Sequence, residues 1–430
     1  MERKSVENLT FWKGSEYRMP LLVTGARQIG KTHTILEFGK NEYRNVLNIN
    51  FEFNKSFKEV FEQNLEPQRI LRELSVRTGE IILPNETLIF FDEIQACPAA
   101  LNSLKYFFEQ IPEYHIIAAG SLLGVALHRE GFSFPVGKVM QMRMNPLDFE
   151  EFLWAVGQRE AANLIRECFA NNEKCLSHDK LMEYYLLYLQ VGGMPQVVQQ
   201  YIAQKDFMFV RALQQNIITN YISDMGKYST PAMTSKTIAT FLSIPSQLTK
   251  ENHKFQFKVI KSGARAKDYQ ESLDWLFNSD IVRKCTLVND GFFPLNTNAN
   301  PTFFKAYLSD VGLLAAQYQI PEAAFLSDFP AFDNIKGSLA ENYVMNSLIC
   351  NGYEPFYWAS EGNAELDFVI QDKDGNIIPI ETKSGNNVRA KSLSVYSERY
   401  KPTTVYRISA KNFGLGNGIK SVPLYATFCI

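Results

Sequence analysis

A glycine-rich segment near the start of the chain has the residue types and spacing of a phosphate-binding loop. Residues 25–32, Gly-Ala-Arg-Gln-Ile-Gly-Lys-Thr, match the pattern GxxxxGK[ST], follow an apolar run and open a helical pattern. Gly25 and Gly30 let the backbone curl, so that its N–H groups and the helix N-terminus face phosphate. Lys31 would neutralise the β and γ oxygens, and the Thr32 hydroxyl would ligate Mg²⁺. The segment predicts a site for ATP and Mg²⁺, with a glycine turn before a helix as the alternative.

A second apolar run, at residues 88–91, ends in two carboxylates. We expect Asp92 to hold the Mg²⁺ through water and Glu93 to orient the attacking water. An acidic pair after a strand is often only a solvated turn, but the upstream loop favours the catalytic interpretation. With Lys31, these carboxylates predict an ATPase.

A third apolar run ends at Gly120-Ser121. Ser121 is a candidate sensor of the γ-phosphate, although the dipeptide suits an ordinary turn equally well. An arginine finger would complete such a site. The candidates are Arg27, Arg129 and Arg143, and none is singled out because most surface arginines only form ion pairs.

Near the other end of the chain, four polar residues follow a second catalytic order. Glu341 lies on a predicted helix, Asp367 on a predicted strand, and Glu381 with Lys383 on the next. This order resembles the PD-(D/E)xK nuclease fold. Because strand side chains alternate, Glu381 and Lys383 share a face. In such a site Asp367 and Glu381 would hold one or two Mg²⁺, Glu341 would add a ligand, and Lys383 would stabilise charge during phosphodiester hydrolysis.

Two simpler interpretations of these residues stay open. Ser338-Leu-Ala-Glu341 also fits a capping box, which would explain Glu341 without a metal. Glu381 and Lys383 could form an exposed ion pair worth under about 1 kcal/mol. Nuclease folds are often retained for binding alone, so fold and activity are separate predictions.

A basic segment lies between Lys250 and Lys267, with Phe255 and Phe257 interleaved. Its six cations and single acid give a local charge of +5 in a chain whose net charge is -2. Cations at the entry to a winged helix would follow the phosphates of DNA. A solvated basic face or an intramolecular partner for acidic neighbours explains the segment equally well, and a protein interface is a further alternative. The tyrosines at 184, 185 and 188 resemble a stacking platform, but their spacing favours a helical core.

These residues need elements to position them. Five short apolar runs alternate with helical patterns, which is typical of a parallel sheet with crossover helices. The runs lie at 21–23, 46–49, 88–91, 115–118 and 139–144. From residue 146 the spacing becomes helical, and residues 236–288 read as short helices followed by strands around the turn 289–291. Residues 366–370 and 377–381, joined by a turn at 372–375, begin a last α/β region.

Several motifs together resemble the prokaryotic AAA-type ATPases that carry a C-terminal domain of unknown function. The resemblance spans nearly the whole chain and rests on residues 25–32, 91–95, 120–121, 145–153, 192–195, 251–255, 263–269, 308–314 and 379–385. It implies an AAA-like core with a lid, a winged-helix-like middle and a nuclease-like end. Gly137-Lys138 stands where the family would have Gly-Arg, which leaves an arginine sensor there in doubt.

We therefore expect an α/β protein in four parts. These are an AAA-like P-loop core at 1–150, a helical lid at 151–225, a winged-helix-like domain at 226–330 and a restriction-endonuclease-like domain at 331–430. The first hypothesis is an Mg²⁺-dependent ATPase whose nucleotide state moves the other parts on or near DNA. The alternative is a nucleotide-controlled switch that acts through protein partners, with an inactive nuclease-like domain. An oligomer is left open.

Composition narrows the class of protein. With 430 residues, 46% of them hydrophobic, and 44 basic against 46 acidic side chains, the chain is neither disordered nor collagen-like. The six cysteines form no CxxC, which indicates reduced thiols rather than disulfides or zinc. The N-terminus lacks the apolar core of a signal peptide, and no apolar run reaches membrane length. We expect a cytoplasmic protein without a membrane span.

Overall fold

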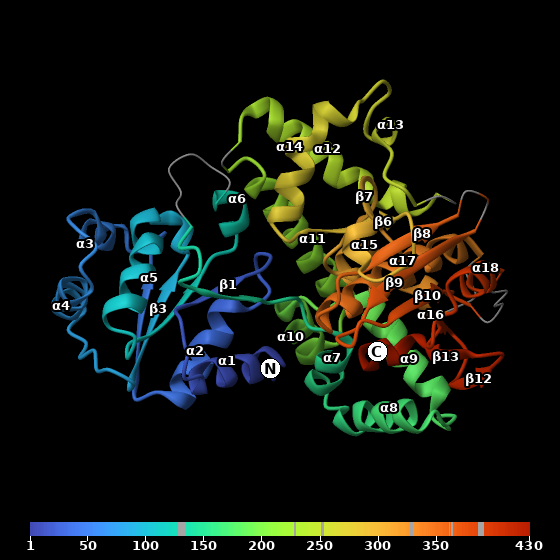
Figure 1. Cartoon of the computed structure of the whole chain (residues 1–430), viewed down its shortest axis with the longest axis horizontal. Helices are drawn as coiled ribbons and strands as arrows, with labels where there is room; N and C mark the ends of the chain where they lie inside the picture. Colours follow the sequence, from blue (N-terminus) through green and yellow to red (C-terminus); the bar gives the residue numbers. More distant parts are fainter. Residues whose placement is uncertain are drawn as a thin grey trace. The chain divides into compact units, whose positions relative to one another are not determined.

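The computed structural model describes residues 1–127, 134–227, 229–250, 253–326, 330–360, 362, 364–385 and 391–430. They form two compact units, each with its own sheet (Figure 1). The N-terminal unit contains residues 2–145 and 278–280. The C-terminal unit contains residues 146–277 and 281–430, with Met1. The domain boundary expected near residue 150 therefore lies four or five residues after the boundary in the structure.

The sheet of the N-terminal unit is parallel throughout, as predicted. Its strands are β1 (Leu21–Thr24), β2 (Asn45–Asn50), β3 (Thr87–Asp92), β4 (His115–Ala119) and β5 (Met140–Arg143). Their order is β2-β3-β4-β1-β5, so each connection crosses over the sheet. The helices of the unit are α1 (Ser5–Gly14), α2 (Lys31–Glu42), α3 (Lys58–Glu62), α4 (Pro67–Thr78), α5 (Pro98–Gln110) and α6 (Leu123–Leu127). All five predicted apolar runs are strands.

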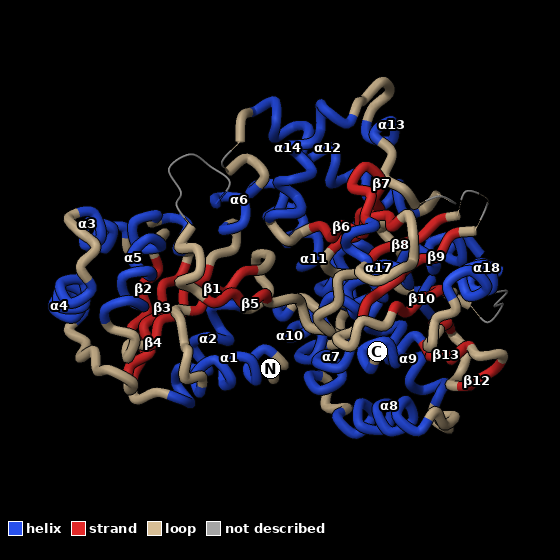
Figure 2. The backbone as a smooth tube through the Cα atoms, in the orientation of Figure 1, coloured by secondary structure: helices blue, strands red, loops and turns tan. Residues whose placement is uncertain are grey.

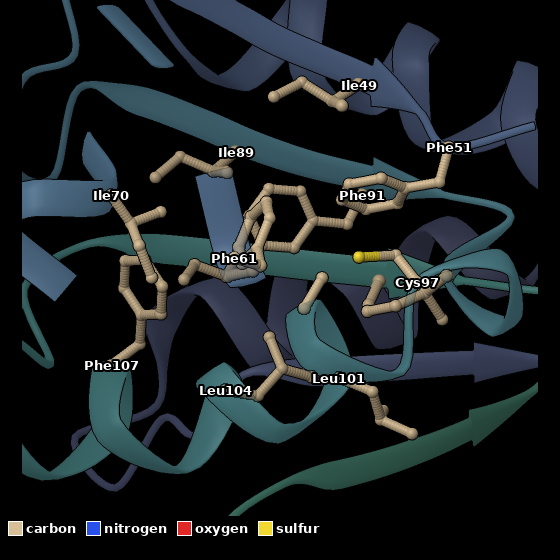
Figure 3. Packing of buried hydrophobic residues seen from close by; sticks show 14 of the residues in the cluster. Ile49, Phe51, Phe61, Ile70, Ile89, Phe91, Cys97, Leu101, Leu104 and Phe107 are labelled. Atoms are coloured by element: carbon tan, nitrogen blue, oxygen red, sulfur yellow. The ribbon is translucent and has the colours of Figure 1, made fainter. Parts of the chain in front are cut away.

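Apolar burial around β3 holds this unit together. All six residues of β3 are buried, since a parallel strand is covered on both faces. Phe91 packs against Phe61 and Phe51, with ring centroids 5.6 and 5.7 Å apart, and Leu101 and Leu104 of α5 lie in the same cluster (Figure 3). The carboxyl end of β3 is therefore rigidly placed.

The C-terminal unit begins with a helical region. It contains α7 (Phe149–Ala155), α8 (Arg159–Asn171), α9 (His178–Val191), α10 (Pro195–Gln204), α11 (Phe207–Asp224), α12 (Pro231–Leu248), α13 (Phe257–Ile260) and α14 (Ala266–Asn278). The helices α8 and α9 contact the last turn, η4 (Leu424–Cys429), and α9 and α11 contact α15 (Val311–Gln317). The predicted lid helices thus pack against later segments of their own unit. Tyr185 and Tyr188 are buried there, as their spacing predicted.

An eight-stranded mixed sheet forms the rest of this unit, together with α16 (Ala323–Leu326), α17 (Pro330–Cys350) and α18 (Lys391–Tyr400) (Figure 2). Its strands are β6 (Val282–Val288), β7 (Ala299–Leu308), β8 (Phe356–Ala359), β9 (Glu365–Gln371), β10 (Ile377–Thr382), β11 (Tyr406–Ser409), β12 (Gly414–Gly416) and β13 (Ile419–Pro423). The order is β12-β13-β11-β10-β9-β8-β6-β7. The turn predicted at 372–375 joins β9 to β10, and Asp372 Oδ1 accepts hydrogen bonds from the backbone N–H groups of Asp374 and Asn376.

The predicted winged-helix hairpin belongs to this same sheet. Strands β6 and β7 pair antiparallel, but β6 also pairs parallel with β8, through residues 286–288 and 356–358. The predicted boundary at 330 therefore does not separate two sheets. Apolar periodicity indicates a strand but not its partner, and these partners lie far apart in the chain. The connection from β6 to β7 is also longer than the predicted turn at 289–291, because η3 (Leu295–Asn298) lies within it.

No helix among the described residues is long and apolar enough to cross a membrane. All six cysteines are free, as predicted.

Asp310 joins distant parts of the C-terminal unit. Its Oδ1 accepts a hydrogen bond from Leu313 N, 2.9 Å away, at the start of α15, and its Oδ2 accepts one from Gly193 N, 2.6 Å away. The carboxyl group is buried, and burial raises its pKa to about 6 against the opposing effect of these N–H donors. It links the break after α9 to α15.

Replacing Asp310 should destabilise the unit in a pH-dependent way. In Asp310→Asn one oxygen becomes an NH₂ group facing a backbone donor, which costs roughly 1–3 kcal/mol. The pKa of Asp310 is higher in the folded protein than in the unfolded chain. Protonation of this carboxyl group therefore stabilises the folded state fully below about pH 4, and this stabilisation is lost as the pH rises through about 6. Urea unfolding should therefore show a wild-type advantage about 1 kcal/mol larger at pH 5 than at pH 7. The exposed Asp179→Asn is the control; an equal advantage at both pH values would contradict the prediction.

Candidate functional site

The predicted phosphate-binding loop links β1 to α2. Its first and last glycines have left-handed φ values, +135° at Gly25 and +92° at Gly30. A Cβ atom on Gly25 would lie 2.4 Å from the carbonyl oxygen of Met144. Only glycine fits these positions without strain. The loop leads directly into α2, where Thr34 N donates to Gly30 O at 2.9 Å.

Lys31 lies inside the curl of this loop. Its Nζ donates to the carbonyl oxygens of Gly25 and Ala26, each 2.8 Å away, and the residue is only 8% exposed. Burial lowers the pKa of this ammonium group to about 8, and the carboxylate of Glu93 opposes that effect. Its neighbours are backbone carbonyls rather than a carboxylate partner at ion-pair distance. The ammonium group is thus available to an incoming anion.

Asp92 lies opposite the start of α2 at the carboxyl end of β3. Its Oδ2 accepts hydrogen bonds from the hydroxyl of Thr32 at 3.1 Å and from Asn50 Nδ2 at 3.0 Å. Burial raises the pKa of Asp92, with a smaller contribution from Glu93, while Thr32 and Asn50 oppose the shift. The structure therefore brings together the two residues predicted to serve Mg²⁺. Asn50 was not among the predicted site residues. It ends β2, directly beside Asp92 in the strand register.

Glu93 follows β3 in a left-handed conformation, with φ +51°. Its Oε2 accepts a hydrogen bond from Gln95 Nε2 at 2.6 Å and one from Ser121 Oγ at 3.3 Å. A Cβ atom at Gly120 would lie 2.1 Å from Gln95 Oε1, so the missing side chain makes room for Gln95. The predicted Ser121 thus touches the predicted catalytic carboxylate.

The candidate arginines have different surroundings. Arg143 forms an ion pair with Asp280, and Arg129 lies outside the described residues. Lys138, which stands where the family would have arginine, pairs with Glu109 at 2.9 Å on the surface. None of these contacts indicates a finger.

The C-terminal sheet places Glu341 in a cluster of charges. This residue lies on α17, and its Oε2 accepts hydrogen bonds from His253 Nδ1 at 2.8 Å and from the Tyr307 hydroxyl at 2.9 Å. Lys305 Nζ lies 3.8 Å from the same oxygen. Burial favours protonation, but Lys305 and His253 outweigh it and hold the pKa of Glu341 well below its usual range.

The capping-box interpretation of Glu341 is wrong. Ser338 and Glu341 lie within α17, well after its start at Pro330. The Ser338 hydroxyl donates to Leu248 O at 2.6 Å. A long helix continues through the motif, so no helix start is present for these residues to cap.

Asp367 and Glu381 lie on the neighbouring strands β9 and β10. Asp367 Oδ2 accepts a hydrogen bond from Thr382 N at 2.7 Å, and burial, followed by the charge of Glu341, raises the pKa of Asp367 to about 7. Glu381 Oε1 pairs with Lys383 Nζ at 2.9 Å. This pair is confirmed but is not fully exposed, since the Glu381 side chain is only 6% accessible.

These carboxylates do not assemble into a metal-binding group. Across the part of the chain that the structure describes, no three His, Cys, Asp or Glu side chains are placed to hold a metal ion. The expected Mg²⁺ site of Glu341, Asp367 and Glu381 is therefore not formed. The physical reason is that Glu341 already accepts two hydrogen bonds and lies 3.8 Å from the Lys305 ammonium group, and that Glu381 is paired with Lys383.

The basic segment between Lys250 and Lys267 has an exposed and a packed part. Residues 251 and 252 lie outside the described residues. Lys258, Lys261, Arg265 and Lys267 are exposed. Phe255 stacks on Phe304 of β7, with centroids 5.1 Å apart, so it is part of the packing rather than an open platform for bases. The exposed face of α14 also carries three acids, Asp268, Glu271 and Asp274.

Comparison with known families identifies the domain that contains the first of the two candidate sites. Residues 17–153 match the family model of an AAA domain. The predicted resemblance to AAA-type ATPases is thus confirmed for this part of the chain. Residues 182–324 and 336–427 match two domains of unknown function, DUF8612 and DUF4143. The resemblance of the C-terminal end to a nuclease stays a prediction.

Solved structures that are similar to this chain share little of its sequence. The Walker-type ATPase PABY2304 of Pyrococcus abyssi is 15% identical, covering 74% of this chain and 95% of that one, with a TM-score of 0.45. The Orc2 protein of Aeropyrum pernix is 13% identical, covering 76% and 95%, with a TM-score of 0.35. The Orc1 protein of the same organism, in complex with DNA, is 13% identical, covering 76% and 93%, with a TM-score of 0.29. No curated protein matches the chain.

Several residues of both sites were missed in the sequence. In the AAA domain, Asn50 could have been found because parallel strands bring their carboxyl ends to one edge. In the C-terminal unit, Lys305 could have been found because it interrupts the apolar strand Phe-Phe-Lys-Ala-Tyr-Leu at 303–308. A charge inside such a strand indicates a buried partner.

Proposed function

We propose that this protein binds and hydrolyses ATP with Mg²⁺ at the loop of its AAA domain. One observation carries the proposal: Lys31, the Thr32–Asp92 pair and Glu93 meet at the carboxyl edge of one parallel sheet. Each has the chemistry that phosphoryl transfer to water requires. Ligands of open α/β sheets bind at this edge.

Each residue has a distinct role in the proposed reaction. The loop N–H groups and Lys31 would hold the β- and γ-phosphates, and Thr32 with Asp92 would hold Mg²⁺, which neutralises developing phosphate charge. Glu93 would orient the attacking water and take its proton. Gln95 donates a hydrogen bond to the Glu93 carboxylate and would be a positioning residue, and Ser121, which also donates to Glu93, would report on the γ-phosphate.

Lys31→Ala should weaken nucleotide binding at least about tenfold. The substitution removes the buried ammonium group, whose charge-assisted hydrogen bonds to phosphate are worth roughly 1.5–3 kcal/mol each, or about ten- to hundredfold in affinity. Titration with a fluorescent ATP analogue measures this loss, and phosphate release measures turnover. Lys40→Ala on the exposed side of the same helix is the matched control. Unchanged turnover in Lys31→Ala would refute the proposal.

Glu93→Gln and Gln95→Leu should separate chemistry from positioning. Glu93→Gln removes the base and should lower kcat by about 10²–10⁴-fold with ATP still bound. Gln95→Leu removes only the 2.6 Å hydrogen bond that orients Glu93, so kcat should fall roughly tenfold at unchanged ATP affinity. The exposed Gln68→Leu serves as control. Equal losses of affinity and kcat in Gln95→Leu would mean that the loop, rather than Glu93, was disturbed.

A second candidate function concerns the C-terminal unit. In the first hypothesis, nucleotide state controls a module that acts on DNA; in the alternative, the nuclease-like sheet is inactive and the protein is a switch. The engagement of Glu341 by His253, Tyr307 and Lys305 favours the inactive form. The exposed cations at 258–267 support DNA contact through phosphates, whose signature is affinity that falls with salt, while the acids of α14 oppose it.

A cleavage assay tests this alternative. The wild-type protein should leave supercoiled plasmid and linear DNA intact with Mg²⁺ or Mn²⁺, because the carboxylates are already neutralised by protein cations. Asp367→Ala and the hairpin control Asp374→Ala should behave identically. Metal-dependent cleavage that disappears only in Asp367→Ala would instead establish an active nuclease.

A further inference from the structure

A lysine lies at the centre of the carboxylate cluster of the C-terminal sheet. Lys305 on β7 is 1% exposed, and its Nζ lies 2.8 Å from Glu365 Oε1 and 3.8 Å from Glu341 Oε2. The first contact is an ion pair without the geometry of a well-directed hydrogen bond. The ammonium group also lies 5.2 Å from the centroid of the Tyr357 ring. Lys305 therefore contacts side chains from α17, β8 and β9.

The charges around Lys305 favour its ionised form. Burial would lower the pKa of this lysine, but Glu341, Glu365 and Asp367 outweigh burial and raise it. His253 adds a second donor to Glu341, and the same carboxylate raises the pKa of His253 against burial. Buried carboxylates are stable only when they are paired and hydrogen-bonded. The protein itself supplies the positive charge that this cluster needs.

A divalent ion does not fit this arrangement. Mg²⁺ requires about six oxygen ligands at roughly 2.0–2.1 Å in octahedral geometry. Glu341 Oε2 already receives two hydrogen bonds and faces Lys305, and Asp367 Oδ2 receives the Thr382 N–H group. Glu381 Oε1 is paired with Lys383. A metal ion would lose these oxygens to existing donors and would be repelled by the buried ammonium group.

We infer that Lys305 is the resident cation of the cluster, that it takes the place of a metal ion, and that its removal converts the cluster into a divalent-cation site. The inference deepens the second candidate function, since it names the group that keeps the nuclease-like sheet inactive. It requires no chemistry at the ATP site. Lys305→Met retains much of the side-chain volume and removes only the charge, so it leaves Glu341, Glu365 and Asp367 with excess negative charge.

Mn²⁺ binding to the full-length, nucleotide-free protein tests the inference. The free-ion signal in electron paramagnetic resonance gives the amount bound, and Asp92→Asn is present in every protein so that the proposed Mg²⁺ site beside Thr32 loses its carboxylate ligand. The Lys305 wild-type protein should bind no Mn²⁺ at this cluster up to about 1 mM. Lys305→Met should bind about one Mn²⁺ ion per chain, at least tenfold more tightly than the parent protein. In EDTA its melting temperature should be lower than that of the parent, and added Mn²⁺ should raise it. Lys305→Arg should behave like the parent.

Two controls make the outcome decisive. Lys284→Met removes an exposed lysine from the adjacent strand β6 and should gain no Mn²⁺. Saturable binding to the parent that Glu341→Gln or Asp367→Asn abolishes would overturn the inference, and so would a folded Lys305→Met that gains no ion. If Lys305→Met fails to fold, the titration of the parent decides alone, since absence of binding supports the inference and binding refutes it. ATP turnover of proteins with intact Asp92 is scored separately, so a failed ATPase proposal leaves this test unaffected.

Discussion

The parallel pairing of β1, β3 and β4 is the constraint on which the proposed ATP site depends. Because the strands run in one direction, the loop after β1, the carboxylates after β3 and Ser121 after β4 reach the same edge. The hydrogen bond from Thr32 to Asp92 spans 60 residues of sequence and exists only because of this arrangement. The buried phenylalanines of the N-terminal unit keep β3 in place. Apolar packing and catalytic geometry are thus one requirement rather than two.

Two buried lysines, one in each unit, differ in the groups that surround them and therefore in what they can bind. Lys31 is surrounded by carbonyl oxygens, and burial lowers its pKa, so its charge is incompletely compensated. Lys305 is surrounded by carboxylates, which raise its pKa despite complete burial. An anion such as phosphate would compensate the charge of Lys31, whereas the charge of Lys305 is already compensated by carboxylates. The same residue type therefore marks a binding site in one unit and a closed ion-pair cluster in the other.

The N-terminal unit was largely predictable because its signals are local. The glycines at 25 and 30, the lysine between loop and helix, and the carboxylates at the end of β3 each lie within a few residues of the element that positions them. Even the sheet direction followed from the alternation of strand and helix. The partners Asn50 and Gln95 were missed because amides have no fixed chemical role, and only the strand register and the space at Gly120 place them against the acids.

The C-terminal unit was less predictable because its decisive contacts are not local. The order of Glu341, Asp367, Glu381 and Lys383 predicts one shared site. The structure pairs Glu381 with Lys383 and places Asp367 within the electrostatic influence of Glu341, but the pattern contains no information about Lys305 and His253. These reach Glu341 from 36 and 88 positions upstream. Lys305 lies on β7, in the hairpin that joins the sheet by pairing β6 with β8, whereas His253 lies in the segment before α13. A row of carboxylates becomes a metal site or an ion-pair cluster according to whether another strand brings a cation. That choice depends on sheet order, which periodicity does not encode.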